Sequence, residues 1–140
     1  MGKKTGQLEK ELSESIDLSG FLRENQEEFL TLEIREALME KLRVRKIPKS
    51  ELARRAGMSE VYLHQILSGR RRPSRDRVIC LCVGLNCSVE ETRQMLRSCR
   101  YSELYAKIRR DAVILFALEH GWDIHQLNDA LFEEGEDPIA

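Results

Sequence analysis

Residues Ser50–Pro73 read SELARRAGMSEVYLHQILSGRRRP, and this stretch decides the fold. Apolar residues come at helical spacing in two short groups, around Leu52 and Leu63, with Gly57 between them. The pattern predicts two short helices joined by a tight turn, because glycine adopts the required positive φ without a steric penalty. Ala53 supplies the small side chain that two helices need where they cross steeply. We expect these side chains to point inward: Leu52, Ala56, Met58, Leu63 and Ile66.

A cationic loop follows directly, since Gly69–Pro73 reads GRRRP. Together with the Leu52-Ala53 pair, Gly57 and Leu63, this loop resembles the Xre-type, lambda-repressor-like family of bacterial and phage regulators. The resemblance covers about Leu30–Val89, under half of the chain. It implies an all-α, lambda-repressor-like helix-turn-helix bundle that binds double-stranded DNA. Some members of such families use the fold only for protein contacts, and that alternative stays open.

In that family the second helix of the motif enters the major groove, with its N-terminal residues at the base edges. The resemblance therefore implies base reading by Ser59, Glu60, Val61, His64 and Gln65. It implies phosphate contacts by Lys49, Ser68, Arg70, Arg71 and Arg72. Among the base readers, Gln65 would bridge adenine N6 and N7, Val61 would touch a thymine methyl group, and Glu60 would accept from cytosine N4.

Three neighbouring side chains keep two interpretations each. Arg54 and Arg55 either approach the DNA backbone or are simply solvated. Tyr62 either belongs partly to the core or contacts a protein partner.

The net charge of −1 conceals an uneven distribution along the chain. Residues 1–40 hold five Lys or Arg and ten Asp or Glu, a net charge of −5. Residues 41–77 hold twelve basic and three acidic residues, a net charge of +9, and residues 78–140 return to −5. The positive charge coincides with the segment that would contact phosphates, which favours nucleic-acid binding over a merely solvated face. An acidic arm lying over this basic segment would weaken DNA binding.

The composition is that of a helix-rich, soluble protein, with 34% charged and 6% aromatic residues. No stretch alternates apolar and polar residues with β-branched enrichment, so an all-α fold is expected. The 140 residues suit one compact domain, or one small domain with an extension. No apolar run has the length of a membrane span, and the polar residues 1–10 are no signal peptide. The expected compartment is the bacterial cytoplasm.

We expect three parts: an acidic arm with a short helix over residues 1–29, the helix-turn-helix domain over 30–87, and a C-terminal helical extension over 88–140. In the arm, the residues up to Glu14 are expected to fray, and a helix begins with Asp17 or Ser19 as its N-cap. The N-caps expected for later helices are Thr31, Ser74 and Ser88.

Beyond Cys99 the sequence resembles its own preceding part at an offset of 35 residues. The segment Arg75–Ile79, RDRVI, aligns with Arg110–Ile114, RDAVI. We interpret residues 74–104 and 109–139 as two similar helical hairpins, of which the second extends the core formed by the first. The alternative is that any two amphipathic helix pairs match this well.

No constellation for catalysis, a cofactor or a metal stands out. Cys80 and Cys82 are two apart in a predicted helix and point to different faces, and the other two cysteines lack the short paired spacing of a zinc site. Buried reduced thiols are the better interpretation. His120 and His125 have no clustered carboxylates, and no phosphate-binding loop or nucleophile motif occurs. We expect neither an enzyme nor a cofactor.

A single helix-turn-helix unit buries too little surface for tight specific binding, so we expect a homodimer on a palindromic DNA site. The C-terminal extension offers a candidate dimer surface, although the same residues would equally complete the core of one monomer. They are Phe116, Leu118, Trp122, Leu127, Leu131 and Phe132.

Two functions follow from these patterns. The leading one is a sequence-specific DNA-binding transcriptional regulator, most simply a repressor. The alternative is a protein-interaction module, antitoxin-like or an adaptor, that uses the acidic tail.

Overall fold

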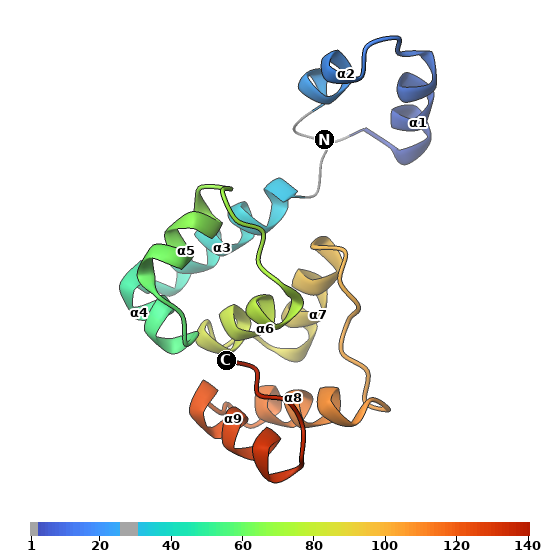
Figure 1. The fold of residues 1–140 in the computed structure, drawn as a ribbon. Helices are drawn as coiled ribbons and strands as arrows, with labels where there is room; N and C mark the ends of the chain where they lie inside the picture. The colour runs from blue at the N-terminus through green and yellow to red at the C-terminus, as the bar shows by residue number, and fades with distance from the viewer. Residues whose placement is uncertain (1–2, 26–30) are drawn as a thin grey trace.

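The computed structural model describes residues 3–25 and 31–140, and every regular element in that part of the chain is a helix (Figure 1). The prediction of an all-α fold is confirmed. The helices are α1 Thr5–Glu14, α2 Leu18–Glu24, α3 Thr31–Arg45, α4 Lys49–Arg55, α5 Glu60–Leu67, α6 Arg75–Gly84, α7 Val89–Ser98, α8 Arg109–Glu119 and α9 Ile124–Glu133.

The described part of the acidic arm holds two helices, α1 and α2. The expectation that residues up to Glu14 fray is wrong, because Thr5–Glu14 form α1. Helix α2 begins after Asp17, one of the two N-caps predicted for it. The two helices contact each other, and Phe21 is buried. The predicted arm boundary at residue 29 lies outside the described residues, and the covering of the basic segment by the arm stays a prediction.

Helices α3 to α6 form the helix-turn-helix unit and its support. Leu52 and Leu63 are fully buried, and α4 contacts both α5 and α6. The backbone of α4 comes close to α6 at Gly84, where an added Cβ would lie 3.1 Å from the backbone nitrogen of Ala56. The predicted inward-pointing set is confirmed, with the difference that Met58 is only partly buried.

Each helix from α3 to α9 is followed by a residue with positive φ, where the chain turns. After α6, the N–H of Cys87 donates to the carbonyl of Cys82 at 2.9 Å, and the N–H of Asn86 donates to that of Val83 at 3.1 Å. These two bonds make a Schellman C-cap, which satisfies carbonyl groups that the helix end leaves free. The residues with positive φ are Lys46, Gly57, Gly69, Asn86, Arg100, Gly121 and Gly135.

The hairpins α6–α7 and α8–α9 make equivalent hydrogen bonds at positions 35 residues apart. Arg75 donates to the carbonyl oxygens of residues 102 and 103, and Arg110 donates to those of residues 137 and 138. A capping box opens the second helix of each hairpin, at Ser88 and at Asp123. Each hairpin therefore holds the segment that follows it in the same way.

The two hairpins also exchange ion pairs. Arg75 pairs with Asp111 at 3.1 Å, and Arg110 pairs with Asp76 at 2.9 Å, each through two hydrogen bonds. Helix α6 contacts α9, and α7 contacts α8. When a residue of one copy contacts a residue of the other, and their equivalents make the same contact in reverse, the two copies are related by an approximate two-fold axis. The hairpins thus face each other across a self-complementary interface inside one chain.

Of the two interpretations given to the C-terminal apolar residues, the monomer core is correct for Leu127 and Leu131. Leu127 and Leu131 are fully buried in the core of the monomer, and Leu118 and Trp122 are partly buried against that core. Their position follows from the pairing of the hairpins, which brings these side chains inward. The two phenylalanines remain exposed, Phe116 at 47% and Phe132 at 84%.

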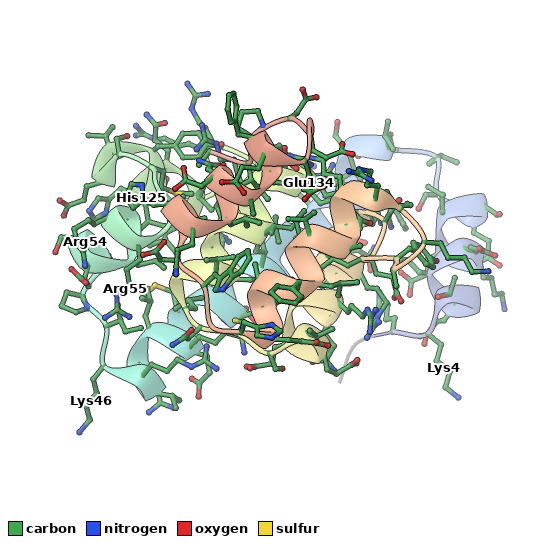
Figure 2. The ribbon with its side chains drawn as sticks, turned by 90° about the horizontal axis from the view of Figure 1, so that it is seen from below. Lys4, Lys46, Arg54, Arg55, His125 and Glu134 are labelled. Atoms are coloured by element: carbon green, nitrogen blue, oxygen red, sulfur yellow. The ribbon has the colours of Figure 1, made fainter. Side chains whose placement is uncertain are left out.

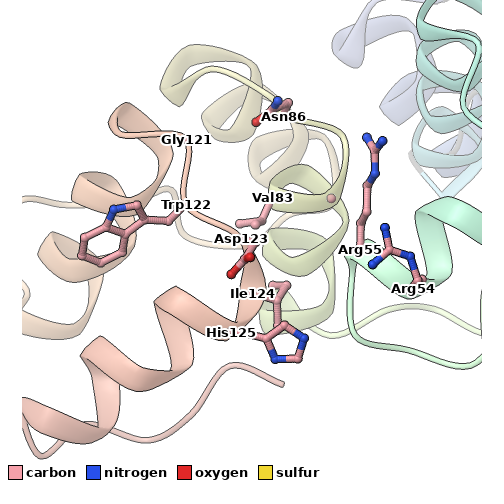
Figure 3. A pocket seen from close by; sticks show the side chains of 10 residues that line it. Arg54, Arg55, Val83, Asn86, Gly121, Trp122, Asp123, Ile124 and His125 are labelled. Atoms are coloured by element: carbon pink, nitrogen blue, oxygen red, sulfur yellow. The ribbon is translucent and has the colours of Figure 1, made fainter.

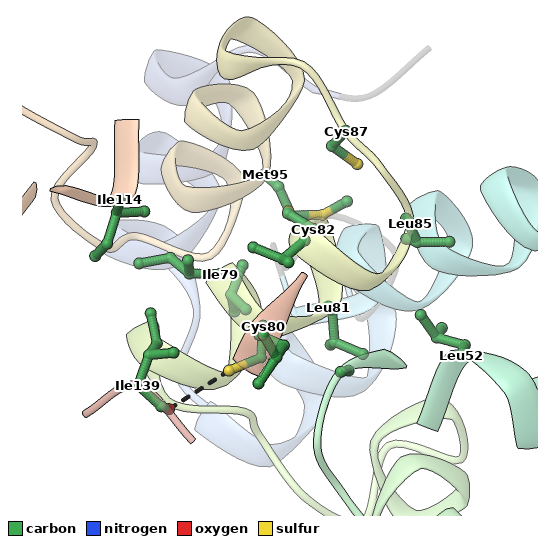
Figure 4. Packing of buried hydrophobic residues seen from close by; sticks show 14 of the residues in the cluster. Leu52, Ile79, Cys80, Leu81, Cys82, Leu85, Cys87, Met95, Ile114 and Ile139 are labelled. Carbon is green, nitrogen blue, oxygen red and sulfur yellow. Dashed lines mark hydrogen bonds between the residues drawn. The ribbon is translucent and has the colours of Figure 1, made fainter. Parts of the chain in front are cut away.

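The cysteines fill the core beside α6. Cys80, Cys82 and Cys87 are buried and free of disulfides, as expected for reduced thiols, and Cys99 is half-buried. The Cys80 thiol donates to the carbonyl of Ile139 at 3.4 Å, which ties α6 to the C-terminal segment (Figure 4). Burial raises the pKa of the Cys80 thiol to about 12. Within the described residues, no group of three or more His, Cys, Asp or Glu is placed to hold a metal ion.

Candidate nucleic-acid interface

Helix α5 presents one polar face to solvent because the apolar residues on its opposite face are buried in the core. Leu63 and Ile66 are buried, and the Oγ of the N-cap Ser59 accepts from the N–H of Tyr62 at 3.0 Å. This cap fixes the start of the helix, where backbone N–H groups lack intrahelical partners. Val61 is 67% exposed.

The predicted base readers lie on this face of α5 or at its N-cap, and they differ in their exposure to solvent. Ser59, Glu60, Val61 and His64 are exposed, and Gln65 is half-buried. His64 Nε2 lies 3.7 Å from Glu60 Oε1, one helical turn away.

Gln65 is held by an arginine from the following loop. Arg71 Nε donates to Gln65 Oε1 at 2.8 Å. The same guanidinium lies over the ring of Tyr62 at 5.7 Å, and Arg77 lies 5.5 Å from that ring. Tyr62 therefore supports two cations beside the polar face, at distances where cation–π attraction operates. Arg71 is engaged with α5, in addition to any contact with phosphate.

The remaining predicted phosphate contacts fall into two groups. Arg70 and Ser68 are exposed after α5, and Lys49 is half-buried at the start of α4. Arg72 instead turns toward α7: its Nη2 donates to the carbonyl of Cys99 at 2.6 Å, and its guanidinium lies 5.0 Å from the ring of Tyr101. Of the three loop arginines, Arg70 makes no such contact with the described residues.

Two cations that the sequence analysis missed lie beside the loop. Arg77 of α6 reaches Tyr62, and Arg35 of α3 approaches Gly69, where an added Cβ would lie 3.0 Å from Arg35 Nη1. Both come from helices outside the motif, so no spacing within Ser50–Pro73 marks them. The position of Arg77 in the basic segment 41–77 was the only signal for it, and Arg35 lies among residues 1–40, of net charge −5, where no signal marked it.

Arg54 and Arg55 lie away from this face. Both donate to the carboxylate of Glu51, Arg55 at 3.0 Å, and these bonds lower the pKa of Glu51 to about 2. Figure 2 shows both arginines toward the same end of the molecule as His125. They line a cavity of about 340 Å³ between α4, the end of α6 and the turn before α9 (Figure 3).

The geometry on this face is that of two short helices crossing at a glycine turn, the second carrying an exposed polar side beside a cationic loop. Residues 33–95 match a family of helix-turn-helix domains. The described structure and this match together show an all-α helix-turn-helix domain. A search of curated proteins found no match, and neither did a search of solved structures.

The helix-turn-helix match extends past α5 into α7. It therefore includes α6 and most of α7. These helices pack against the rest of the domain, since α6 contacts α4 and α7 contacts α3. Helices α8 and α9 lie beyond the matched residues. Among the described helices, none combines the length and the apolar character that crossing a membrane requires.

Proposed function

We propose that this protein is an Xre-type regulator of transcription that binds double-stranded DNA sequence-specifically and acts as a repressor. The observation that carries the proposal is the exposed polar face of α5, set in a segment of net charge +9 within a helix-turn-helix domain. Cations grouped around a groove-sized helix supply the electrostatic part of DNA binding. No catalytic step belongs to this function, and its place is the bacterial cytoplasm.

The proposed contacts divide by type. Base edges are read by Ser59, Glu60, Val61, His64 and Gln65, which share the outer side of α5. Phosphates are bound by Lys49, Ser68 and the loop arginines, with Arg70 the most available of these. Arg71 also donates a hydrogen bond to Gln65. Arg72 must break its hydrogen bond to the carbonyl of Cys99 before it can contact a phosphate. Arg77 and Arg35 join the phosphate-facing set.

Salt dependence tests the proposal. Each phosphate neutralised releases counterions, so the logarithm of affinity for a duplex falls linearly with the logarithm of salt concentration. We expect Arg70→Ala to flatten that slope by about one unit. Arg55→Ala is the matched control, because Arg55 faces the cavity beside α8–α9, and it should leave the slope unchanged. Absence of binding to a pool of random duplexes at low salt would contradict the proposal.

Selection of bound sequences from random DNA then defines the site. A homodimer predicts two inverted half-sites separated by about one helical turn. A reporter carrying the selected site across its promoter tests repression, since expression should fall when the protein is supplied.

A protein-interaction function is the second candidate. The acidic segment 78–140, of net charge −5, and the exposed Phe132 favour it. It would be supported by the failure of DNA binding at low salt together with an intact fold.

A further inference from the structure

We propose that the outer face of α8 binds a second copy of this chain, α8 against α8 in antiparallel orientation. The proposal deepens the regulatory function above and rests on it only for the use of the dimer on DNA. It names the surface through which the two copies meet.

Comparison of the two hairpins shows that the face of α6 equivalent to the outer face of α8 is covered by another helix. Residues 74–104 and 109–139 are two copies of one hairpin, since equivalent side chains hold equivalent carbonyl groups and exchange reciprocal ion pairs. In the first copy, Leu81 and Leu85 of α6 are fully buried, and α6 contacts α4. Their equivalents in the second copy are Phe116 and His120, and both are exposed. The second hairpin therefore lacks the cover that α4 supplies to the first.

The uncovered face is aromatic and ordered by its own contacts. Phe116 stacks on His120 with ring centroids 3.8 Å apart, and it meets Trp122 edge-on at 5.1 Å. An exposed aromatic group held in one arrangement loses little conformational entropy on binding, and aromatic residues dominate the energetics of interfaces.

The order of residues along α8 suits a second copy of the same helix. Arg109, Ala112, Phe116 and Glu119 follow one another at spacings of three and four, so they lie along one stripe. Against an antiparallel copy, Arg109 faces Glu119 at both ends, and each Phe116 lies over the small Ala112 of the other. A two-fold interface needs this self-complementary order.

Arg109 is available for this role. Its side chain is 67% exposed, and it pairs within the chain with Glu134 at 2.7 Å and with Glu136 at 3.5 Å. Exposed ion pairs contribute little to stability, so exchanging Glu134 and Glu136 for Glu119 of the other copy costs little.

The other candidate surfaces suit a second copy less well. The inner faces of the hairpins are already occupied by each other, as the burial of Leu127 and Leu131 shows. Phe132 is more exposed than Phe116, but Asp129 and Glu133 lie within one turn of it. A two-fold contact centred on Phe132 would bring like charges together, which is unfavourable.

Sedimentation equilibrium of the full chain over a range of concentrations tests the proposal. We expect wild-type dimers, and a dimer Kd raised about tenfold or more by Phe116→Asp. Phe132→Asp is the matched control, because it places the same charge on an exposed phenylalanine outside the stripe, and it should leave Kd unchanged. Circular dichroism confirms that each variant is folded.

A charge exchange keeps the test decisive if Phe116→Asp unfolds the chain. Glu119→Arg should weaken the dimer by placing arginines opposite each other, and Arg109→Glu with Glu119→Arg should restore it. The proposal is overturned by a wild-type monomer at about 100 µM, where even weak complexes assemble. It is also overturned by equal effects of the two phenylalanine variants, or by no rescue in the double variant. Binding to random duplexes, measured on the same samples, reports separately on the regulatory function.

Discussion

At the scale of single residues, the structure sharpens the role of Gln65. A bidentate contact with adenine uses both the amide oxygen and the amide nitrogen. Because Gln65 Oε1 already accepts from Arg71, the amide cannot flip without losing that bond, and its NH₂ group is the part turned away from Arg71. The oxygen keeps a second lone pair, so we expect Arg71 to hold the amide in the one orientation in which Oε1 accepts from adenine N6 and the NH₂ group donates to N7.

Replacing Arg71 separates positioning from phosphate binding. We expect Arg71→Ala to relax base preference at the position that Gln65 contacts, because the amide regains both orientations. Arg70→Ala should weaken binding to all sequences alike. Selection from random DNA with the two variants measures this difference. A uniform loss of affinity in both, with unchanged preferences, would show that Arg71 is only a phosphate contact.

Gly57 is required for two reasons: its backbone has a positive φ, and the C-terminal segment packs close to its Cα. Its φ is +68°, and an added Cβ would lie 3.2 Å from Ala140 Cβ and 3.3 Å from Ile124 Cγ2. Gly121 has a similar φ of +66° with nothing within 4 Å of an added Cβ. We expect Gly121→Ala to cost about 1–2 kcal/mol from backbone strain alone. Gly57→Ala should cost more, because the tail must also shift.

Urea unfolding of the two glycine variants measures these costs. Equal losses would mean that the contact between the tail and the turn contributes nothing. A larger loss for Gly57→Ala would show that the C-terminal segment supports the helix-turn-helix turn directly.

At the scale of elements, a charged cluster joins α3 to α7. Glu91 accepts from Lys41 at 2.5 Å and from Arg45 Nη2 at 3.0 Å, and it also caps α7 through the N–H of Ser88. The hydrogen bond from Lys41 is the main cause that lowers the pKa of Glu91 to about 2, from an ordinary value of 4.5. Arg45 also donates to the Cys87 thiol at 3.5 Å. The cluster holds α3 against α7, the first and the last helix that the helix-turn-helix match includes.

This cluster predicts a loss of stability in acid. A carboxyl group with a lower pKa in the folded state stabilises the fold above its unfolded pKa, and that stability is lost as pH falls through the folded pKa. The window for Glu91 therefore runs from about pH 4.5 down to about pH 2. We expect Glu91→Gln to unfold at lower urea concentration at pH 7 and to lose less stability than wild type across the window. Parallel pH dependence in the two proteins would exclude this role.

At the scale of the whole molecule, the tail is joined to the helix-turn-helix domain through the two-fold pairing of hairpins. Asp111 is the buried member of this pairing, at 2% exposure, and Oδ2 also accepts from the N–H of Tyr105 at 3.1 Å. Asp76 is its equivalent, with a side chain 38% exposed. Asp76 and Asp111 thus occupy the same place in the pairing with different burial.

Replacing these aspartates tests how firmly the tail is joined. Removing one partner of a buried ion pair is destabilising by about 3–5 kcal/mol, because the remaining charge is left without compensation. We expect Asp111→Ala to approach that range, reduced because Arg75 is partly exposed, and Asp76→Ala to cost about 1 kcal/mol or less. Thermal unfolding measures both. Similar losses in the two variants would argue against the burial of Asp111 as the cause.

Local patterns were sufficient for much of this molecule. The turn at Gly57, the inward set around Leu52, and the caps Ser74 and Ser88 depend on backbone conformation and helical spacing, which are properties of neighbouring residues. The helix over Thr5–Glu14 was missed because Leu8 and Leu12 are its only apolar side chains, and none of its residues is buried. Helical periodicity alone cannot tell a side chain covered by another helix from one left uncovered.

The amino-acid sequence by itself determined the all-α class, the helix-turn-helix motif, the basic segment around it and the 35-residue offset. Only the tertiary structure decided which cations lie beside the motif: Arg77 and Arg35 approach it, whereas Arg54 and Arg55 donate to Glu51 and Arg72 donates to the carbonyl of Cys99. It also decided that Leu127 and Leu131 are core residues and that Phe116 is not. The physical reason is that charge and apolarity are properties of a residue, whereas burial and partnership depend on which helices the chain brings together.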